Sequence, residues 1–554
     1  MDAERKYPLE DVWWKKGVIY QVYPRSFMDD SGDGVGDLPG ITSRLEYLPW
    51  LGVDAVWISP IYASPMVDFG YDVTDHQSIH PLFGNLEDFD GLIEEAHRLG
   101  LKVVLDYVPN HTSDEHPWFV ESRSSRENPK RDWYIWRDPA PENPGGLPNN
   151  WLSVFGGPAW TFDKETGQYN YHAYLKEQPD LNWGNPDVRE AMLDVMRFWL
   201  DRGVDGFRLD GLRHLVKDEK LRDNPPNPRR RPSSPPYDAL LPTYSADRPE
   251  IHDLISKIRK VLEEDSSTWV SGERAMVGEL YLPIERLVRY YGENGKGVHL
   301  PSNMHLISTP WDARKIAELV EEYEAALPEG AWPNWVLGNH DRSRIATRLG
   351  AGQARVAAML LLTLRGTPTL YYGDEIGMAD GFVPAEKVQD PFEKNVPGIG
   401  VGRDPERTPM QWNNAPNAGF CPEGVEPWLP VPSDRTTVNV TTESEDPGSL
   451  LTLYRFLLDL RRRERALSIG SYQRVFVGGD LFAYRREHED CDFLIVLNLG
   501  SGHQTLDLAE SGLSGRISLS THPGREEEVI QGEIALHPNE GIVAKLSYLS
   551  ERRR

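Results

Sequence analysis

Residues 188–210 read VREAMLDVMRFWLDRGVDGFRLD, and the fold prediction starts from this stretch. Apolar residues recur at spacings of three and four over 188–200, which predicts an amphipathic helix. A short apolar run at 204–209 follows and ends at Asp210, which is typical of a buried strand. A helix that leads into a buried strand is the repeating element of parallel α/β folds.

The same alternation recurs along the chain. Short apolar runs rich in β-branched residues occupy 18–23, 55–61, 102–108, 204–209, 275–280, 298–307, 335–337 and 369–372. Helical spacing occupies 86–99, 188–200, 251–262, 313–326 and 352–364. A strand followed by a helix, repeated about eight times, predicts an α/β protein built on a (β/α)8 TIM barrel.

Two segments depart from this alternation. Residues 112–183 are rich in Pro, Gly, Asn and Trp and show no clear helix, which predicts an inserted subdomain after the third strand. After residue 469 the runs 474–477, 482–485, 493–497 and 533–537 alternate, which predicts a C-terminal antiparallel β-sandwich domain. We therefore expect four segments: the barrel at 1–111 and 184–468, the insertion at 112–183, and the β domain at 469–554.

Composition restricts the class of protein. The chain has 554 residues, of which 39% are hydrophobic and 26% charged, as in folded globular proteins. Its net charge of −26 would repel phosphates, so we expect no nucleic-acid partner. Cys421 and Cys491 are too few for a disulfide framework, and the charged start MDAERKYPLEDVWWKKG has no signal-peptide core. The longest apolar run, 356–364, is too short for a membrane helix. We expect a cytoplasmic protein without membrane contact.

Polar residues collect where four of the predicted strands end. The segments are DYVPNH (106–111), GFRLD (206–210), VGE (277–279) and GNHD (338–341). Active sites of such barrels lie on the loops that follow these strand ends. One Asp after a strand is often only a helix cap, and one His is usually structural. Four such ends together indicate an active site.

The residue types fit the cleavage of a glycosidic bond. Retaining cleavage needs one carboxylate to attack the anomeric carbon and a second carboxyl group to protonate the leaving oxygen, roughly 5–5.5 Å away. Adjacent strand ends provide that separation. Arg208 precedes Asp210 by two residues and so points to the same side of the strand, where it can hold Asp210 ionised. Histidines and a third carboxylate around the sugar would stabilise the charged transition state.

These segments, in this order, resemble glycoside hydrolase family 13, the α-amylase superfamily, over nearly the whole chain. QPDLN (178–182) and GTPTLYYGDEIGM (366–378) join them in the pattern. QPDLN, together with RDPERTPMQW (403–412), is similar to the α-glucosidase and oligo-1,6-glucosidase branch rather than to endo-amylases.

The resemblance implies a role for each of three acids. Asp210 matches the nucleophile, Glu279 the general acid/base, and Asp341 the third carboxylate, which binds the transition state. Glu273 in SGER is a second acidic candidate nearby, but the VGEL context favours Glu279. No cofactor is expected for the chemistry.

The resemblance also implies a pocket for one glucose. Its matching residues are His111, Arg208 and His340 around the sugar, Asp68 and Tyr71 at the non-reducing end, and Arg403 as the partner of Asp68. A pocket closed by Asp68 and Arg403 would leave no room beyond one glucose, which is the basis of exo action. The alternative is that these two residues form only a surface ion pair.

A second site is expected near the N-terminus. The segment 29–37 resembles the calcium loop of this branch, with oxygens at alternate positions and glycines that permit a tight turn. The expected ligands are Asp29, Ser31, Asp33, Val35 and Asp37. Serine replaces the usual Asn at position 31 and is a weaker ligand, so a structural Ca²⁺, a Mg²⁺, or a loop held by hydrogen bonds all stay open.

Gly211 departs from the family pattern. The branch generally has Val after the nucleophile in α-1,6 enzymes and Ala or Thr in α-1,4 enzymes. Glycine removes bulk beside the site of the leaving group (the aglycone), which favours an α-1,4 aglycone.

The expected function is therefore a retaining, exo-acting α-glucosidase that acts on short α-glucosides or small oligosaccharides. One alternative is an oligo-1,6-glucosidase. Another forms the same covalent intermediate but passes glucose to an acceptor other than water, as trehalose synthases, sucrose isomerases and transglucosidases do. Non-catalytic transporter partners of this family lose catalytic carboxylates, whereas all three acids are present here. The sequence leaves the oligomeric state open.

Overall fold

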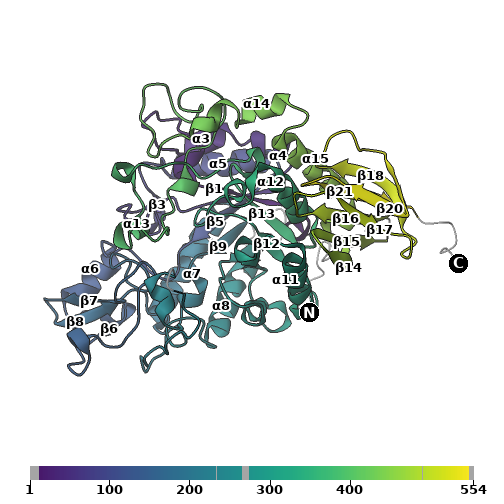
Figure 1. Ribbon diagram of the computed structural model, residues 1–554. Coiled ribbons are helices and arrows are strands. Elements are labelled where there is room, and N and C mark those ends of the chain that lie inside the picture. The colour runs from purple at the N-terminus through teal and green to yellow at the C-terminus, as the bar shows by residue number, and fades with distance from the viewer. Residues whose placement is uncertain (1–11, 232–233, 265–273, 490, 548–554) are drawn as a thin grey trace.

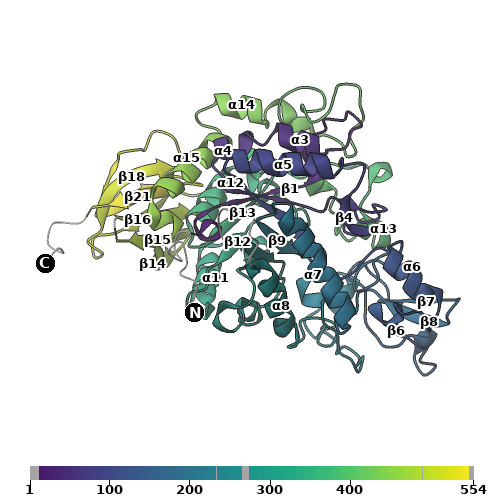
Figure 2. The same ribbon diagram turned by 180° about the vertical axis from the view of Figure 1, so that it is seen from behind.

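The computed structural model describes residues 12–231, 234–264, 274–489 and 491–547, and the structural statements below concern these residues. Figure 1 shows a central barrel, a small blue-coloured subdomain on one side of it, and a yellow β domain on the other. Figure 2 shows α5 (Leu86–Arg98) and α7 (Pro186–Asp201) on the outer surface of the barrel.

Eight parallel strands close into a barrel, which confirms the predicted fold class. In spatial order they are β1 (Ile19–Val22), β2 (Ala55–Ile58), β5 (Lys102–Tyr107), β9 (Gly206–Leu209), β10 (Ala275–Gly278), β11 (Leu300–Asn303), β12 (Asn334–Val336) and β13 (Thr367–Tyr371). Each lies within or overlaps one predicted run. The run 298–307 was too long as a strand, because Asn303 accepts a hydrogen bond from the His305 N–H and the chain turns into helix α10 (His305–Ser308).

The larger helices around the barrel begin at clear signals. Asn85 forms a capping box with Asp88 at the start of α5, and Asn185 and Asp312 cap α7 and α11. The remaining large helices are α8 (Ile251–Glu263), α11 (Ala313–Ala326), α12 (Ile345–Thr363) and α15 (Leu450–Arg463). Gly350 in α12 has a φ of 77°, so the regular helix resumes beyond this residue, close to the predicted start at residue 352.

Short elements complete the barrel domain. They are α1 (Trp13–Lys16), α2 (Pro24–Phe27), α3 (Leu38–Ser43), α4 (Tyr47–Leu51), α9 (Ile284–Leu287), α13 (Pro391–Asn395), α14 (Val440–Glu445), α16 (Arg465–Ser468), and the pair β3 (Tyr62–Ala63) and β4 (Asp75–Ile79). Within the described residues no helix is long and apolar enough to cross a bilayer.

Segment 112–183 contains a three-stranded antiparallel sheet in the order β6 (Trp136–Arg137), β8 (Gln168–Tyr171), β7 (Trp160–Asp163). Trp151, Trp160 and Tyr171 form its small core. The expectation of no helix in this segment is wrong, because α6 (Pro117–Ser124) lies in it. This helix begins with Pro117 and is capped by His116, and its apolar residues do not form a clear stripe.

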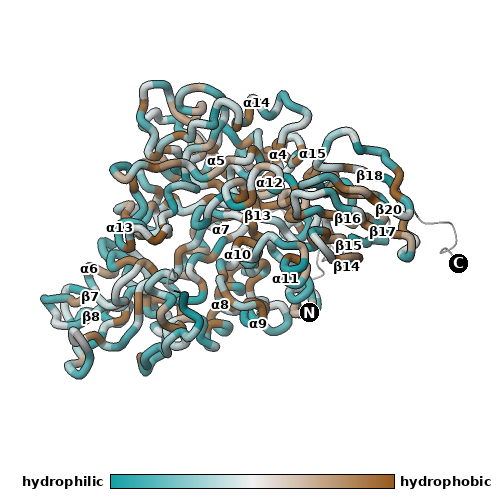
Figure 3. The backbone as a smooth tube through the Cα atoms, viewed as in Figure 1, coloured by the Kyte–Doolittle hydropathy of each residue, from teal (hydrophilic) through white to brown (hydrophobic). Residues whose placement is uncertain are grey.

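The C-terminal strands form one antiparallel sheet. They are β14 (Ser471–Gly478), β15 (Leu481–His488), β16 (Cys491–Asn498), β17 (Gln504–Asp507), β18 (Ser514–Ser520), β19 (Val529–Gln531), β20 (Glu533–Leu536) and β21 (Gly541–Leu546). The order is β14-β15-β16-β21-β18-β19-β20-β17. Leu494 of β16 and Leu506 of β17 share one buried cluster although four strands lie between them in that order, so the sheet folds over its own core. Figure 3 shows both hydrophobic and hydrophilic stretches in this domain, and β16 is buried continuously after its first residue.

Two buried arginines lie where the β domain meets the barrel, and Arg486 joins the two. Arg486 of β15 donates to backbone oxygens at the end of α12 and around α16, including those of Thr363 and Leu467. Arg461 of α15 donates to the oxygens of Leu362 and Gly366. Burial, with the nearby Arg461 charge, lowers the pKa of Arg486 to about 9, so the carbonyl oxygens solvate a charge that water does not reach.

We expect Arg486→Met to lower the free energy of unfolding by about 3 kcal/mol, because several buried carbonyls lose their donors. Thermal unfolding followed by calorimetry measures the change. Arg474→Met is the matched control, because Arg474 pairs with Glu321 at the surface and should change stability by less than about 1 kcal/mol. Equal effects of the two substitutions would contradict this account of the interface.

Candidate active site

A cavity of about 1130 Å³ lies at the carboxyl ends of the barrel strands. Eight of the nine residues expected around the substrate line it: Asp68, Tyr71, His111, Asp210, Glu279, His340, Asp341 and Arg403. The ninth, Arg208, is almost fully buried behind them. The barrel thus brings together side chains that are up to 335 residues apart in the sequence.

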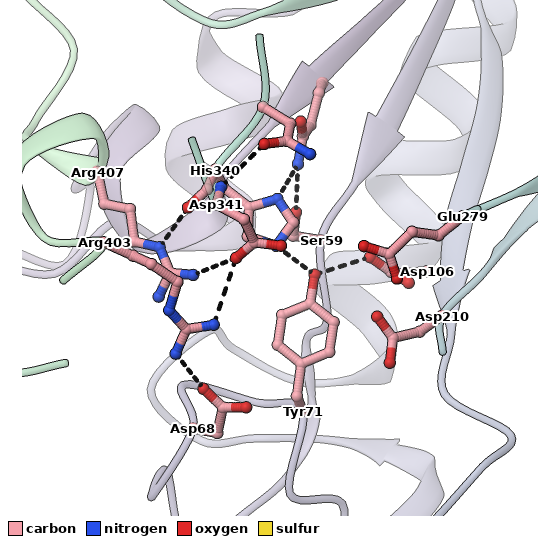
Figure 4. Close-up of polar contacts among 12 residues, drawn as sticks. Ser59, Asp68, Tyr71, Asp106, Asp210, Glu279, His340, Asp341, Arg403 and Arg407 are labelled. Atoms are coloured by element: carbon pink, nitrogen blue, oxygen red, sulfur yellow. Dashed lines mark hydrogen bonds and ion pairs between the residues drawn. The ribbon is translucent and has the colours of Figure 1, made fainter. Parts of the chain in front are cut away.

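Strands β9 and β10 place Asp210 and Glu279 side by side. Leu209 pairs with Gly278 in the parallel register, so the residue after each strand emerges at the same level. The Glu279 N–H donates to the Leu209 oxygen, and the Gly211 N–H donates to the Glu279 carboxylate at 3.2 Å. Figure 4 shows both carboxyl groups near Asp106 and the Tyr71 hydroxyl.

Arg208 connects three acids. Its Nη1 lies 2.6 Å from an oxygen of Asp210 and 2.8 Å from one of Asp106, and its Nη2 lies 3.0 Å from Glu279. The Arg208 guanidinium therefore orients both expected catalytic carboxyl groups, and Asp106 accepts a hydrogen bond from the same guanidinium. A planar fork of donors suits this task better than a lysine ammonium would.

Burial and nearby charges shift the pKa values of Asp210 and Asp106. Burial raises the pKa of Asp210 well above its ordinary value, Arg208 lowers it, and the negative charges of Glu279 and Asp106 raise it. Burial also raises the pKa of Asp106 to about 6. Burial and the neighbouring negative charges therefore oppose the ionisation of Asp210, whereas Arg208 favours it.

Asp341 lies on the opposite wall between two arginines. Its Oδ1 accepts from Arg407 at 2.8 Å and from Arg403 at 3.3 Å. Burial acts to raise the pKa of Asp341, but the positive charges around it hold the pKa below the usual range. Burial lowers the pKa of the neighbouring His340 to about 3, so at neutral pH the two arginines keep Asp341 ionised.

His340 belongs to a hydrogen-bond chain that ends at Asp106. The Gln21 amide donates to His340 Nδ1 at 2.7 Å, so Nε2 carries the proton and donates to the Tyr71 hydroxyl at 2.9 Å. The Tyr71 hydroxyl donates in turn to Asp106 at 3.1 Å, as Figure 4 shows. The chain fixes the tautomer of His340 and links Tyr71 to the acid that holds Arg208.

Asp68 and Arg403 form a buried pair rather than a surface one. Arg403 Nη2 lies 2.8 Å from Asp68, and both side chains are less than a tenth exposed. Gln178 of the QPDLN segment donates to the other Asp68 oxygen, and Asp390 accepts from Arg403 at 2.7 Å. The alternative of a surface ion pair is therefore wrong.

His111 is also buried in the wall of the cavity. Its Nε2 donates to the Tyr71 carbonyl oxygen at 3.0 Å, and Asn110 donates to its Nδ1. Burial lowers its pKa to about 4, so the ring is neutral near pH 7. Direct hydrogen bonds from His111 and His340 to a sugar stay a prediction.

The loop expected to bind calcium lies apart from this cavity. Asp29 accepts from the N–H groups of Gly32 and Gly34 at 2.6 and 2.8 Å, and Asp37 accepts from those of Ser31 and Gly40. In the part of the chain that the structure describes, no three His, Cys, Asp or Glu side chains converge as a metal site. Backbone N–H groups thus orient the carboxylates of Asp29 and Asp37 in this loop. The ion stays a prediction, and no step below uses it.

Sequence reasoning missed several supporting residues. Asp106 and Gln178 lie inside quoted motifs, and Arg407 lies in RDPERTPMQW, so strand position and motif membership were available signals. Asp390 follows no strand and stands in a Pro-rich loop, where only the folded chain reveals its partner Arg403. Glu273, the rejected acid/base candidate, lies outside the described residues.

Comparisons with known proteins agree with this geometry. The family model for the α-amylase catalytic domain matches residues 21–470. The chain belongs to the α-amylase family. It is a glycoside hydrolase. A probable α-glucosidase of Rhizobium meliloti strain 1021 is 41% identical over 97% of both chains, and maltase 1 of Drosophila virilis is 40% identical over 96% of this chain and 87% of its own. The crystal structure of the α-glucosyl transfer enzyme XgtA is similar, with a TM-score of 0.90 and 39% identity, over 97% of this chain and all of the other.

We expect Asp390→Asn to lower kcat/KM of this family 13 enzyme by roughly 10- to 100-fold, because Arg403 loses a buried charged partner and shifts away from Asp68 and Asp341. Steady-state kinetics on a nitrophenyl α-glucoside measure the loss. Glu393→Gln is a control at a nearby carboxyl, which accepts from the Gly398 N–H and, among the described residues, forms no ion pair with Arg403. A loss below twofold in the Asp390 variant would show that Arg403 is positioned without it.

Proposed function

We propose that this glycoside hydrolase is a retaining, exo-acting α-glucosidase that releases terminal α-D-glucose from short α-glucosides, with α-1,4 linkages favoured. One observation carries the proposal: Arg208 contacts Asp210 at 2.6 Å and Glu279 at 3.0 Å beside a cavity that the buried Asp68–Arg403 pair also lines. The similarity to relatives named α-glucosidase and maltase supports the same function.

In the first step Asp210 is the nucleophile. Arg208 binds one of its carboxylate oxygens, which leaves the other free to form a bond to the anomeric carbon. Glu279 gives its proton to the glycosidic oxygen as the bond between that oxygen and the anomeric carbon breaks. The aglycone leaves as an alcohol, and glucose stays on Asp210 as an ester.

In the second step water replaces the aglycone. Glu279, now ionised, takes a proton from water as the oxygen of that water attacks the anomeric carbon and the bond to Asp210 breaks. Two inversions restore the α configuration in the released glucose. The carboxyl pair regains its single proton and is ready for the next substrate.

Asp341 stabilises the positive charge that develops on the sugar ring between these states. Arg403 and Arg407 both bind its Oδ1, so its negative charge has a fixed place. A charge that is oriented before the reaction costs no reorganisation when the transition state forms. Because the arginines keep it ionised, this acid has a different task from the nucleophile and the acid/base.

The closed wall explains exo action. Asp68, Arg403 and Asp390 form one buried cluster, and Asp68 and Arg403 line the cavity. Their charged groups can bind the outer hydroxyls of a terminal glucose, while no further residue of a longer chain can extend beyond them. Internal cleavage of a polysaccharide is therefore disfavoured by geometry.

Transfer of glucose to an alcohol is the second candidate function. The cavity of about 1130 Å³ is larger than one glucose requires, and its lining includes the apolar side chains of Phe155, Leu240 and Val383. Such a lining can hold an acceptor in place of water. The structural similarity to an α-glucosyl transfer enzyme favours this side reaction.

A panel of maltose, isomaltose, trehalose, sucrose and a nitrophenyl α-glucoside tests the proposal by glucose release. We expect release from maltose and from the nitrophenyl glucoside. Asp210→Asn should lower kcat by more than about 10⁴-fold on both, because an amide cannot form the glucosyl ester. No release by the natural chain from any substrate would exclude the proposal.

Glu279→Gln separates the two carboxyl roles within the same experiment. Nitrophenolate leaves without a proton, so this variant should lose far more activity on maltose than on the nitrophenyl glucoside. The Asp210 variant should lose both activities. If the two variants show the same pattern, the assignment of acid/base and nucleophile is wrong.

A further inference from the structure

The side chain of Tyr174 fills the space next to Gly211. A Cβ atom built on Gly211 would lie 3.0 Å from the Tyr174 hydroxyl oxygen and 3.4 Å from its Cε2. The backbone of Gly211 has a φ of 54°, a left-handed conformation that side-chain-bearing residues adopt at a cost. A larger residue at position 211 would clash with Tyr174, so the observed position of the Tyr174 side chain requires glycine at 211.

Tyr174 is firmly positioned at this place. Its ring packs against those of His111 and His214 at centroid distances of 5.3 and 5.4 Å. Its carbonyl oxygen accepts from the Ser153 hydroxyl, and from the ring of His172 at 2.9 Å. These contacts come from the barrel and from segment 112–183, so the hydroxyl has a defined position in the cavity wall.

The hydroxyl of Tyr174 is a neutral donor beside the catalytic pair. Tyr174 is half-buried and lines the cavity together with Asp210, Gly211 and Glu279. Burial, and then the negative charges of Asp210 and Glu279, raise the pKa of Tyr174 well above its ordinary value. It therefore keeps its proton throughout the pH range in which a glycosidase works, and it can donate to a substrate oxygen.

We propose that Tyr174 determines linkage specificity by donating a hydrogen bond to an aglycone hydroxyl on the carbon next to the linking carbon. Gly211, the residue after the nucleophile, leaves space for the Tyr174 hydroxyl and does not itself contact the aglycone. This inference rests on the proposed function and specifies its substrate class.

Sugar chemistry gives the proposal its direction. In an α-1,4-linked glucose the linking carbon C4 has a neighbour, C3, that carries a hydroxyl. In an α-1,6-linked glucose the linking carbon C6 is attached only to C5, which carries no free hydroxyl. A donor placed beside the leaving oxygen therefore favours α-1,4, α-1,3 and α-1,2 linkages over α-1,6, because only these offer it a partner there.

The test compares kcat/KM for maltose and isomaltose in the natural chain and in Tyr174→Phe. The variant keeps the ring and removes only the hydroxyl. We expect the maltose-to-isomaltose ratio to fall by roughly tenfold, the size of one hydrogen bond made in the transition state. Tyr169→Phe is the matched control, because Tyr169 lies in the same segment and donates to the Gly145 oxygen, and it should leave the ratio unchanged.

A double-mutant cycle with Gly211→Ala tests the mutual dependence. Alone, Gly211→Ala should lower kcat/KM for maltose strongly, because its methyl group displaces the Tyr174 hydroxyl. In the Tyr174→Phe background the 3.0 Å contact is gone, so the same substitution should cost about tenfold less. Thermal unfolding of each variant identifies any loss that comes from misfolding.

Two results would overturn the inference: an unchanged linkage ratio in Tyr174→Phe, or strictly additive effects in the cycle. Both leave the proposed function intact, because they require glucose release by the natural chain. Absence of glucose release from every substrate instead removes the proposed function.

Discussion

The whole site depends on one buried guanidinium. Arg208 is almost inaccessible to water and yet contacts Asp106, Asp210 and Glu279. A charge in that position costs several kcal/mol to desolvate, and only well-placed carboxylates offset the cost. Parallel strands β5, β9 and β10 supply those carboxylates at adjacent strand ends. The position of Arg208 therefore couples the stability of the barrel interior to the geometry of the reacting pair.

A second cationic cluster, Arg403 and Arg407, organises the opposite wall. It fixes Asp341 as an ionised group and holds Asp68 at the closed wall of the pocket. Two acids in one cavity thus acquire different properties: burial and negative neighbours raise the pKa of Asp210, whereas the positive charges around Asp341 hold its pKa below the usual range. This division follows from burial and from the number of arginines near each acid, and it matches the two needs of a retaining glycosidase.

The sequence predicted the barrel well, because buried parallel strands such as β5 and β9 are short apolar runs that end in polar residues. The same rule located Asp210, Glu279 and Asp341. The sequence did not predict helix α6, because its apolar residues form no clear stripe. It did not predict the role of Asp390 either, because this residue lies in a loop and meets Arg403 only in the folded chain. From the sequence, Gly211 was expected to leave space beside the aglycone, whereas the folded chain shows that Tyr174 occupies that space.

The central claim is that Asp210 forms a covalent bond to glucose, while Glu279 donates a proton to the leaving oxygen and then accepts one from water. Incubation with 5-fluoro-α-D-glucosyl fluoride, followed by proteolysis and mass spectrometry, tests it most directly. The account predicts an added fluoroglucosyl mass on the peptide that contains Asp210, and no adduct in Asp210→Asn. An adduct on another residue, or turnover that inverts the anomeric carbon without any adduct, would contradict it.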